Sequence, residues 1–181
     1  MMGDDVTRRR PGMRRVTLAR LPGFSPSRLR AARERRGLSI LDLADLIGMT
    51  RSSVHKWEAG DVAPDPRRAK KAADVLGVPL QALTDLVDDE IGLAERRALN
   101  GMTARDLSRE SGIDSATLSH IESGHRRPSE HQAAALAAVL GLGPAELQAL
   151  WERTRARRMI ELRRRAGLAD QHHDETGPAQ G

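Results

Sequence analysis

The chain has 181 residues, two Trp, one Phe, no Tyr and no Cys, and it carries a formal net charge of +5. This length allows one or two small domains, and the lack of Cys excludes disulfides, thiolate zinc sites and thiol nucleophiles. With so few aromatic side chains, the core must consist of aliphatic residues and Ala, which suits packed helices better than sheets. The positive charge is compatible with a nucleic-acid partner.

No run approaches the roughly 18 apolar residues that a membrane span requires. The N-terminal sequence MMGDDVTRRRPGMRR lacks the apolar segment of a secretory signal. We therefore expect a cytoplasmic protein with no membrane partner. The basic residues are nearly all Arg, a usage typical of GC-rich bacterial genomes.

The chain contains an internal repeat, because residues 37–83 align without a gap with residues 101–147. Many of the matching positions are turn or core residues, so the two copies share their architecture and not their surface residues. They are Gly37/Gly101, Asp42/Asp106, Leu43/Leu107, Gly48/Gly112, Glu58/Glu122, Gly60/Gly124, Pro64/Pro128, Leu76/Leu140, Gly77/Gly141 and Leu83/Leu147. Two units, each long enough for a small domain, favour tandem domains over a solenoid.

In chain order, residues 1–24 are expected to form a flexible basic arm, which either contacts nucleic acid or is a solvated tail. A first domain of five helices is predicted over residues 25–84. Its helices are expected to begin at Ser25–Pro26, after Ser39 and after Thr50, to cover about 66–76, and to begin again near Pro79.

The same plan predicts a second domain over residues 89–166, with Asp89 as the N-cap of its first helix. Its helices are expected at about 90–99, 104–111, 115–123 and 129–140, with a long last helix from about 144 to 165. The connection between the domains is short, so the last helix of the first domain is expected to run almost directly into the second. The polar residues 167–181 are expected to be disordered.

Two short helices joined by a tight Gly turn, the second exposed and capped, form the helix-turn-helix plan. Both copies carry its signature positions: Leu29, Arg33, Gly37-Leu38-Ser39, Leu43-Ala44, Gly48, Trp57-Glu58-Ala59-Gly60, Pro64 and Leu76-Gly77-Val78 in the first, and Leu93, Arg97, Gly101-Met102-Thr103, Leu107-Ser108, Gly112, Ile121-Glu122-Ser123-Gly124, Pro128 and Leu140-Gly141-Leu142 in the second. Each repeat therefore resembles a lambda-repressor-like (Cro/repressor, XRE-type) helix-turn-helix domain. The resemblance implies an all-α fold of two tandem five-helix domains with an extended last helix.

The resemblance also implies that the third helix of each domain contacts DNA bases. In the first domain the outward-facing residues are Arg51, Ser52, His55 and Lys56, and Arg or Lys is the commonest partner of guanine. The second domain offers Ser115, Ala116, Ser119 and His120, a largely neutral set. The alternative interpretation is that these polar residues only solvate surface helices.

Phosphate contacts are expected at helix N-termini, and the resemblance implies further phosphate contacts in the loop after the third helix. The candidates are Ser39, Thr50, Thr103, Arg126 and Arg127. The first copy thus looks suited to contacting DNA bases, and the second to contacting the phosphate backbone of DNA. The alternative is that the second copy has lost DNA binding and serves dimerisation. Many family members have Gln where this chain has Ile40 and Ala104, which removes one expected contact from each domain.

By the same resemblance, Glu58 pairs with Arg33 and Glu122 with Arg97, and these ion pairs are expected to be structural. No sequence motif of a metalloprotease, P-loop, hydrolase elbow or EF-hand is present. We therefore expect no catalytic residues, no metal and no cofactor.

These observations predict a sequence-specific, double-stranded-DNA-binding transcriptional regulator, a repressor that acts by occupying its site. The alternative is an architectural or antitoxin-like protein in which the second repeat mediates homodimerisation or binds a partner.

Overall fold

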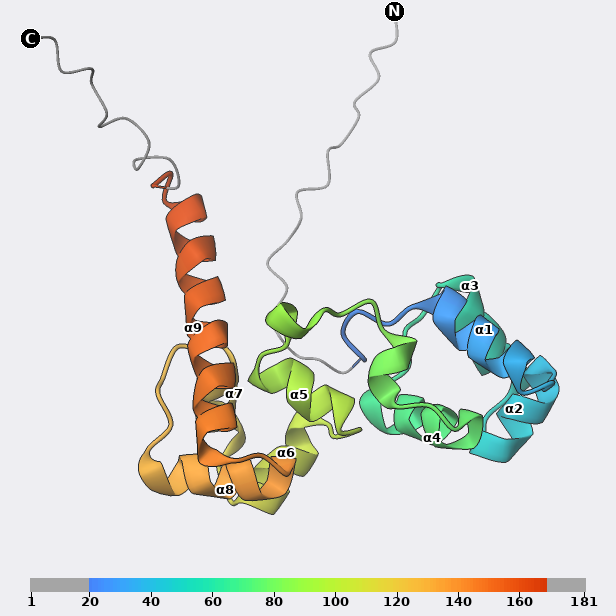
Figure 1. Ribbon diagram of the computed structural model, residues 1–181, viewed down its shortest axis with the longest axis horizontal. Helices are drawn as coiled ribbons and strands as arrows, with labels where there is room; N and C mark the ends of the chain where they lie inside the picture. Colours follow the sequence, from blue (N-terminus) through green and yellow to red (C-terminus); the bar gives the residue numbers. More distant parts are fainter. Residues whose placement is uncertain (1–19, 169–181) are drawn as a thin grey trace, which may run out of the picture.

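The computed structural model describes residues 20–168, which contain nine α-helices, two 3-10 helices and no strand (Figure 1). The helices of the first domain are α1 (Pro26–Arg35), α2 (Ile40–Ile47), α3 (Arg51–Ala59), α4 (Pro66–Leu76) and the 3-10 helix η1 (Leu80–Leu83). Those that follow are η2 (Asp88–Glu90), α5 (Leu93–Leu99), α6 (Ala104–Ser111), α7 (Ser115–Glu122), α8 (Glu130–Leu140) and α9 (Pro144–Arg165). The predicted all-α fold with two tandem domains is confirmed.

Local signals define the helix-turn-helix of the first domain. Ser39 and Asp42 form a capping box, in which the Asp42 amide donates to Ser39 Oγ at 3.1 Å and the Ser39 amide donates to Asp42 Oδ2 at 2.7 Å. Helix α2 ends at Gly48, whose φ of +68° lies in the left-handed region that Gly adopts without strain. Thr50 then caps α3 through the Ser53 amide. The second domain repeats this arrangement from Thr103 to Gly112.

The core of each domain consists of aliphatic side chains on the inner faces of these helices. In the first domain Leu29, Leu43 and Val54 are at most 1% exposed, and Trp57 is 4% exposed. Leu93, Leu107 and Leu118 are the buried counterparts in the second domain. Burying one such side chain stabilises a fold by about 1.5–3 kcal/mol, so these repeated positions provide much of the stability of each domain.

The expected fifth helix of the first domain is a single 3-10 turn, and it does not continue into the second domain. The backbone leaves it in an extended conformation at Thr84, which forms an antiparallel bridge with Phe24. The Ser25 amide donates to the Leu83 carbonyl at 2.9 Å and the Asp85 amide to the Gly23 carbonyl at 2.8 Å. Pairing with the segment that enters the domain thus takes the place of further helical hydrogen bonds.

The first helix of the second domain begins later than predicted, and Asp89 is not its N-cap. Residues 88–90 form η2, and α5 starts after Gly92. The Gly92 amide donates to Glu95 Oε2 at 2.9 Å, and the Leu93 amide donates to Thr154 Oγ1 of α9 at 3.3 Å. A Cβ atom at Gly92 would collide with Thr154 and Arg157. The distant helix α9 therefore determines where α5 begins.

The expected basic arm is shorter than 24 residues. Leu21 is 3% exposed, and its amide donates to the Pro64 carbonyl at 2.7 Å, so an apolar side chain anchors this segment to the first domain. The rest of the arm, residues 1–19, lies outside the described part of the chain. Residues 169–181 of the expected polar tail lie outside it as well.

The two domains contact each other along α4, as Figure 1 shows in the middle of the molecule. Arg67 Nε of α4 donates to Asp106 Oδ2 of α6 at 2.8 Å, and Asp106 is only 3% exposed. The Lys70 side chain covers Gly101, where an added Cβ would lie 2.8 Å from Lys70 Cβ. This contact gives the second domain a polar anchor on the first.

Helix α9 is the longest element and extends beyond the rest of the second domain (Figure 1). Within residues 20–168, no single helix combines the length and apolar composition needed to cross a membrane. Helices α8 and α9 meet the criteria of length and apolar composition only when they are taken together, and they are bent by 104° relative to each other.

Candidate nucleic-acid interface

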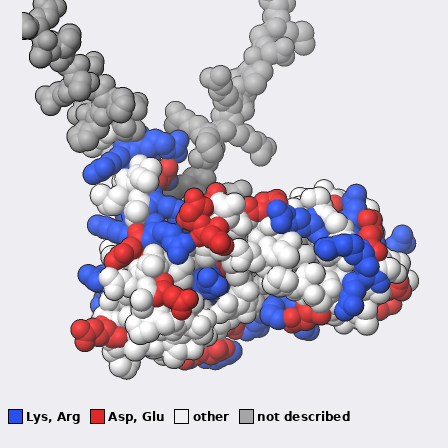
Figure 2. All heavy atoms as spheres, in the orientation of Figure 1, with Lys and Arg blue, Asp and Glu red and all other residues white. Residues whose placement is uncertain are grey.

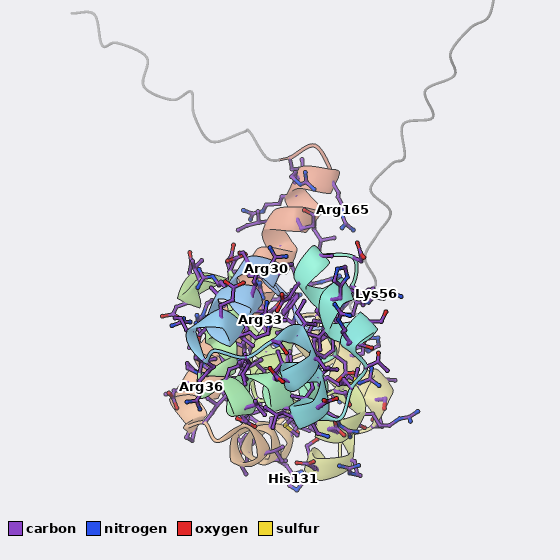
Figure 3. All side chains as sticks on the ribbon, turned by 90° about the vertical axis from the view of Figure 1, so that its right-hand side faces the viewer. Arg30, Arg33, Arg36, Lys56, His131 and Arg165 are labelled. Atoms are coloured by element: carbon purple, nitrogen blue, oxygen red, sulfur yellow. The ribbon has the colours of Figure 1, made fainter. Side chains whose placement is uncertain are left out.

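Helix α3 presents its polar residues to solvent and its apolar residues to the core. Arg51, Ser52, His55 and Lys56 are all exposed, whereas Val54 is fully buried. Figure 3 shows Lys56 on the outer side of α3, away from Arg30 and Arg33 of α1 and from Arg36, which follows α1. The four predicted residues thus share one accessible surface on a capped helix, the arrangement that a major-groove recognition helix requires.

A buried ion pair holds α3 against α1. Arg33 Nε donates to Glu58 Oε1 at 2.7 Å and Arg33 Nη2 donates to Glu58 Oε2 at 2.8 Å, so the contact is bidentate. Arg33 Nη1 also donates to the Leu38 carbonyl at 2.7 Å, in the connection to α2. Hydrogen bonding to Glu58 keeps the pKa of Arg33 above its ordinary value. One guanidinium therefore joins the three helices that position the exposed surface.

The second domain contains the equivalent pair. Arg97 Nε donates to Glu122 Oε1 at 2.6 Å, Nη2 donates to Oε2 at 3.1 Å, and Nη1 donates to the Met102 carbonyl at 2.9 Å. The two ion pairs differ in the residues that surround them. Arg30 lies 3.5 Å from Glu58 in the first domain, whereas Ala94 stands at the matching position of the second. Arg97 is fully buried.

Helix α7 offers a more neutral surface than α3. Ser115, Ala116, Ser119 and His120 are exposed, as the repeat predicts. The N-cap of α7 is Asp114, whose side chain accepts from the Thr117 amide at 2.9 Å. Hydrogen bonds with Thr117 hold the pKa of Asp114 below its ordinary value. The N-cap of α7 is therefore an ionised carboxylate, whereas the N-cap of α3 is the neutral side chain of Thr50.

The three hydroxyl groups predicted to contact phosphate all cap helices. Ser39 and Thr50 are exposed, and each accepts a hydrogen bond from a backbone amide of its own helix. Thr103 is half-buried, and its hydroxyl donates to Asp106 at 2.6 Å. The start of α6 also lies against Arg67 of the first domain. The start of α2 is therefore more accessible than the start of α6.

The loop after α7 is attached to α9. Trp151 Nε1 donates to the Arg126 carbonyl at 3.1 Å, and the Arg127 guanidinium lies 5.7 Å from the centroid of the Trp151 ring. Arg155 Nη1 donates to the Gly124 carbonyl at 3.0 Å. Arg126 and Arg127 are both exposed. The sequence pattern gives no sign that Trp151 and Arg155 contact this loop, because the two segments are distant in the chain and only the packing of α9 joins them.

Among residues 20–168, no group of three or more His, Cys, Asp or Glu side chains lies close enough together to hold a metal ion.

Comparison with known families gives one result that covers both repeats. The helix-turn-helix family model matches residues 29–83 and again residues 93–147, together more than half of the chain. Comparisons with curated proteins and with solved structures give no match. The two matches contain both buried ion pairs and both exposed helices α3 and α7. The chain therefore belongs to the XRE-type helix-turn-helix family of DNA-binding regulators, as a tandem pair of domains.

Proposed function

We propose that this protein is a sequence-specific transcriptional repressor that acts by occupying double-stranded DNA. The observation that carries the proposal is the exposed surface of α3, on which Arg51 and Lys56 extend from a helix capped by Thr50. Arg and Lys are the side chains that most often contact guanine in the major groove. A bound protein excludes other proteins from the same DNA, so repression needs no chemical step. Its proposed place of action is the bacterial cytoplasm, at the nucleoid.

We further propose that one chain covers two unequal half-sites. The contact between Arg67 and Asp106 supports this arrangement, since it limits independent movement of the two domains. Recognition helices of paired helix-turn-helix domains reach half-sites about 34 Å apart, one turn of DNA. Because α3 and α7 carry different exposed residues, the two half-sites should differ in sequence, and a single chain needs no palindrome.

The test is selection of preferred sites from random duplex DNA by the full chain, followed by measurement of affinity. Arg51→Ala should weaken binding to the selected site by about 1–3 kcal/mol and relax the preference at one base pair. The double variant Arg51→Ala, Lys56→Ala is compared with Arg35→Ala, Lys71→Ala, which removes the same charge from exposed residues of α1 and α4. Equal affinity of the wild type and the α3 variant for the selected site would refute base reading by α3.

A second function, homodimerisation or partner binding through the second domain, is supported by a hollow between α8 and α9. It has a volume of about 400 Å³ and is lined mainly by apolar side chains, including Ala133, Ala137, Leu147 and Trp151. The selected site distinguishes the two arrangements. A palindrome bound by two chains, with residues 51–56 protected and 115–120 free, would favour a dimer and exclude the single-chain bipartite site.

A further inference from the structure

The arginines of α9 fall into two groups according to their partners. Arg157 Nη2 lies 2.9 Å from Glu95 Oε2, and Arg164 and Arg165 both pair with Glu161. Four arginines of α9 differ from these, because none of them forms an ion pair with a carboxylate within residues 20–168: Arg153, Arg155, Arg158 and Arg163. Arg153 donates to the Asp88 carbonyl of η2, and Arg163 lies in the last turn of α9, whereas Arg155 and Arg158 lie near α7 and the loop after it. Arg158 Nε is buried and has no hydrogen-bond partner among those residues. Near α7, two arginines without an ion-pair partner, Arg155 and Arg158, therefore stand one turn apart on α9.

These two arginines lie beside the end of α7. The backbone of α9 approaches Gly124, the second residue after α7, so closely that an added Cβ would lie 3.0 Å from Arg155 Cα. Gly124 also has a φ of +71°, a conformation that favours Gly. Contacts between α7 and α9 complete this side of the domain. The approach brings the Arg155 side chain next to the loop that follows the recognition helix.

The region between α7 and α9 has a positive electrostatic character. The rings of His120 on α7 and His125 in the loop are 5.7 Å apart. The pKa of His125 lies below its ordinary value, because of desolvation first and then because of Coulombic interaction with Arg158, His120 and Arg155. No carboxylate contributes to that shift. The side of α9 next to η2 differs, because Figure 2 shows Asp and Glu side chains there.

We propose that Arg155 and Arg158 of α9, together with Arg126 of the loop, bind backbone phosphates of double-stranded DNA next to α7. This surface extends the interface of the second domain beyond its helix-turn-helix, and it rests on the proposed function. It supplies the charge that the neutral surface of α7 lacks. Guanidinium groups are well suited to this role, since they stay protonated and match the geometry of phosphate oxygens.

The test measures binding of the full chain to a 30-base-pair duplex of random sequence over a series of salt concentrations. Arg155→Gln, Arg158→Gln should lower the slope of log K against log salt by about two and weaken binding at least about tenfold at 0.1 M salt. The matched control is Arg163→Gln, Arg164→Gln, which removes the same charge from the free end of α9. Its affinity should fall by less than about threefold.

Two further variants separate a phosphate contact from a structural role of these side chains. Arg155→Lys, Arg158→Lys keeps both charges and should retain the wild-type slope, whereas a purely structural role predicts a loss as large as that of the Gln variant. Arg158→Gln alone breaks no hydrogen bond or ion pair within residues 20–168 and should lower the slope by about one. It also provides the test if the double Gln variant does not fold.

The outcomes distinguish this inference from the function on which it rests. Binding by the wild type with an unchanged slope in the Arg155→Gln, Arg158→Gln variant would overturn the α9 surface and leave the DNA-binding function standing. A wild-type chain that binds neither random duplexes nor any selected site would overturn the proposed function itself.

Discussion

The two domains share a backbone plan but distribute their positive charge differently. In the first domain the charge lies on the recognition helix, as Arg51 and Lys56. In the second, the matching positions are Ser115 and His120, and the cations lie instead in the loop after α7 and on α9. The comparison shows that repeats with the same core need not use the same surface. Core positions are constrained by packing, whereas surface charge is free to move to whichever element lies nearby.

The domains differ as well in the accessibility of their second helices. The start of α2 is exposed at Ser39, while the start of α6 lies against α4 of the first domain through Arg67 and Asp106. Asp106 therefore has two roles, because it caps α6 and also accepts from the neighbouring domain. The first domain thus combines an exposed surface on α3, which we propose to contact DNA, with support for the second domain.

The largest expected effect concerns the two buried ion pairs. Arg97→Ala should destabilise the protein by about 3–5 kcal/mol, because it leaves the buried carboxylate of Glu122 without a partner. Arg33→Ala should cost less, since Arg30 lies 3.5 Å from Glu58 and remains as a partner. Chemical unfolding of the full chain followed by helix content measures both losses. Equal losses of stability in the two variants would show that Arg30 does not replace Arg33 as the partner of Glu58.

The next prediction tests whether charge on the recognition helix distinguishes the domains. Arg51→Ser gives α3 the residue that α7 carries at Ser115. It should weaken binding to the selected site by about 1–3 kcal/mol, because the bidentate guanine contact proposed for Arg51 would be lost. Ser115→Ala in α7 is the matched comparison and should have a smaller effect. A larger loss from the α7 variant, measured by titration at one salt concentration, would reverse the proposed division of roles.

A smaller effect is expected at the contact between domains. Arg67→Ala removes the two charge-assisted hydrogen bonds that Arg67 Nε and Nη2 donate to the buried Asp106, and Arg109 remains 3.7 Å from that carboxylate. The expected loss of stability is about 1–2 kcal/mol. The variant should also bind DNAs with altered half-site spacing more evenly than the wild type does. Arg68→Ala, the neighbouring exposed residue of α4, is the control and should keep the spacing preference.

The smallest predicted effect is the pH dependence of the helix caps. Hydrogen bonds with Ser39 hold the pKa of Asp42 below its ordinary value of 3.8, and those with Thr117 act likewise on Asp114. A lowered folded-state pKa contributes stability that is present above the unfolded value and is lost as pH falls through the folded value. The free energy of unfolding should therefore decrease below pH 3.8.

Asp42→Asn, Asp114→Asn keeps an acceptor at each cap without a titrating carboxyl group. This variant should reduce the acid-induced decrease when unfolding is measured in urea at a series of pH values. An identical decrease in the variant and the wild type would assign the effect to other carboxylates.

Most helices of the two domains lie where the sequence predicts them, because their starts and stops depend on local chemistry. Ser39 and Thr50 cap the helices that were predicted to begin after them, and Thr103 caps the helix that was predicted at about 104–111. Gly48 ends α2 and Gly112 ends α6. The predicted ranges of α4, α6 and α9 agree with the structure for the same reason. These signals act over three or four residues, so neighbouring residues in the chain are sufficient to specify them.

The connection between the domains was predicted wrongly, because long-range contacts decide it. Thr84 pairs with Phe24, and the amide of Leu93 donates to Thr154 from the far end of the second domain. A helical pattern that looks continuous in sequence is interrupted when backbone groups find partners elsewhere. The anchoring of Leu21 beside Pro64 has the same origin.

The sequence by itself therefore determined the tandem repeat, the all-α class and the exposed polar surfaces of α3 and α7. Periodicity and caps express these features, and both are local properties of the chain. Only the tertiary structure decided that Arg67 reaches Asp106 and that Arg155 lies beside Gly124. Such contacts join residues far apart in the chain, and they depend on how whole helices pack, a property that the pattern within one segment does not contain.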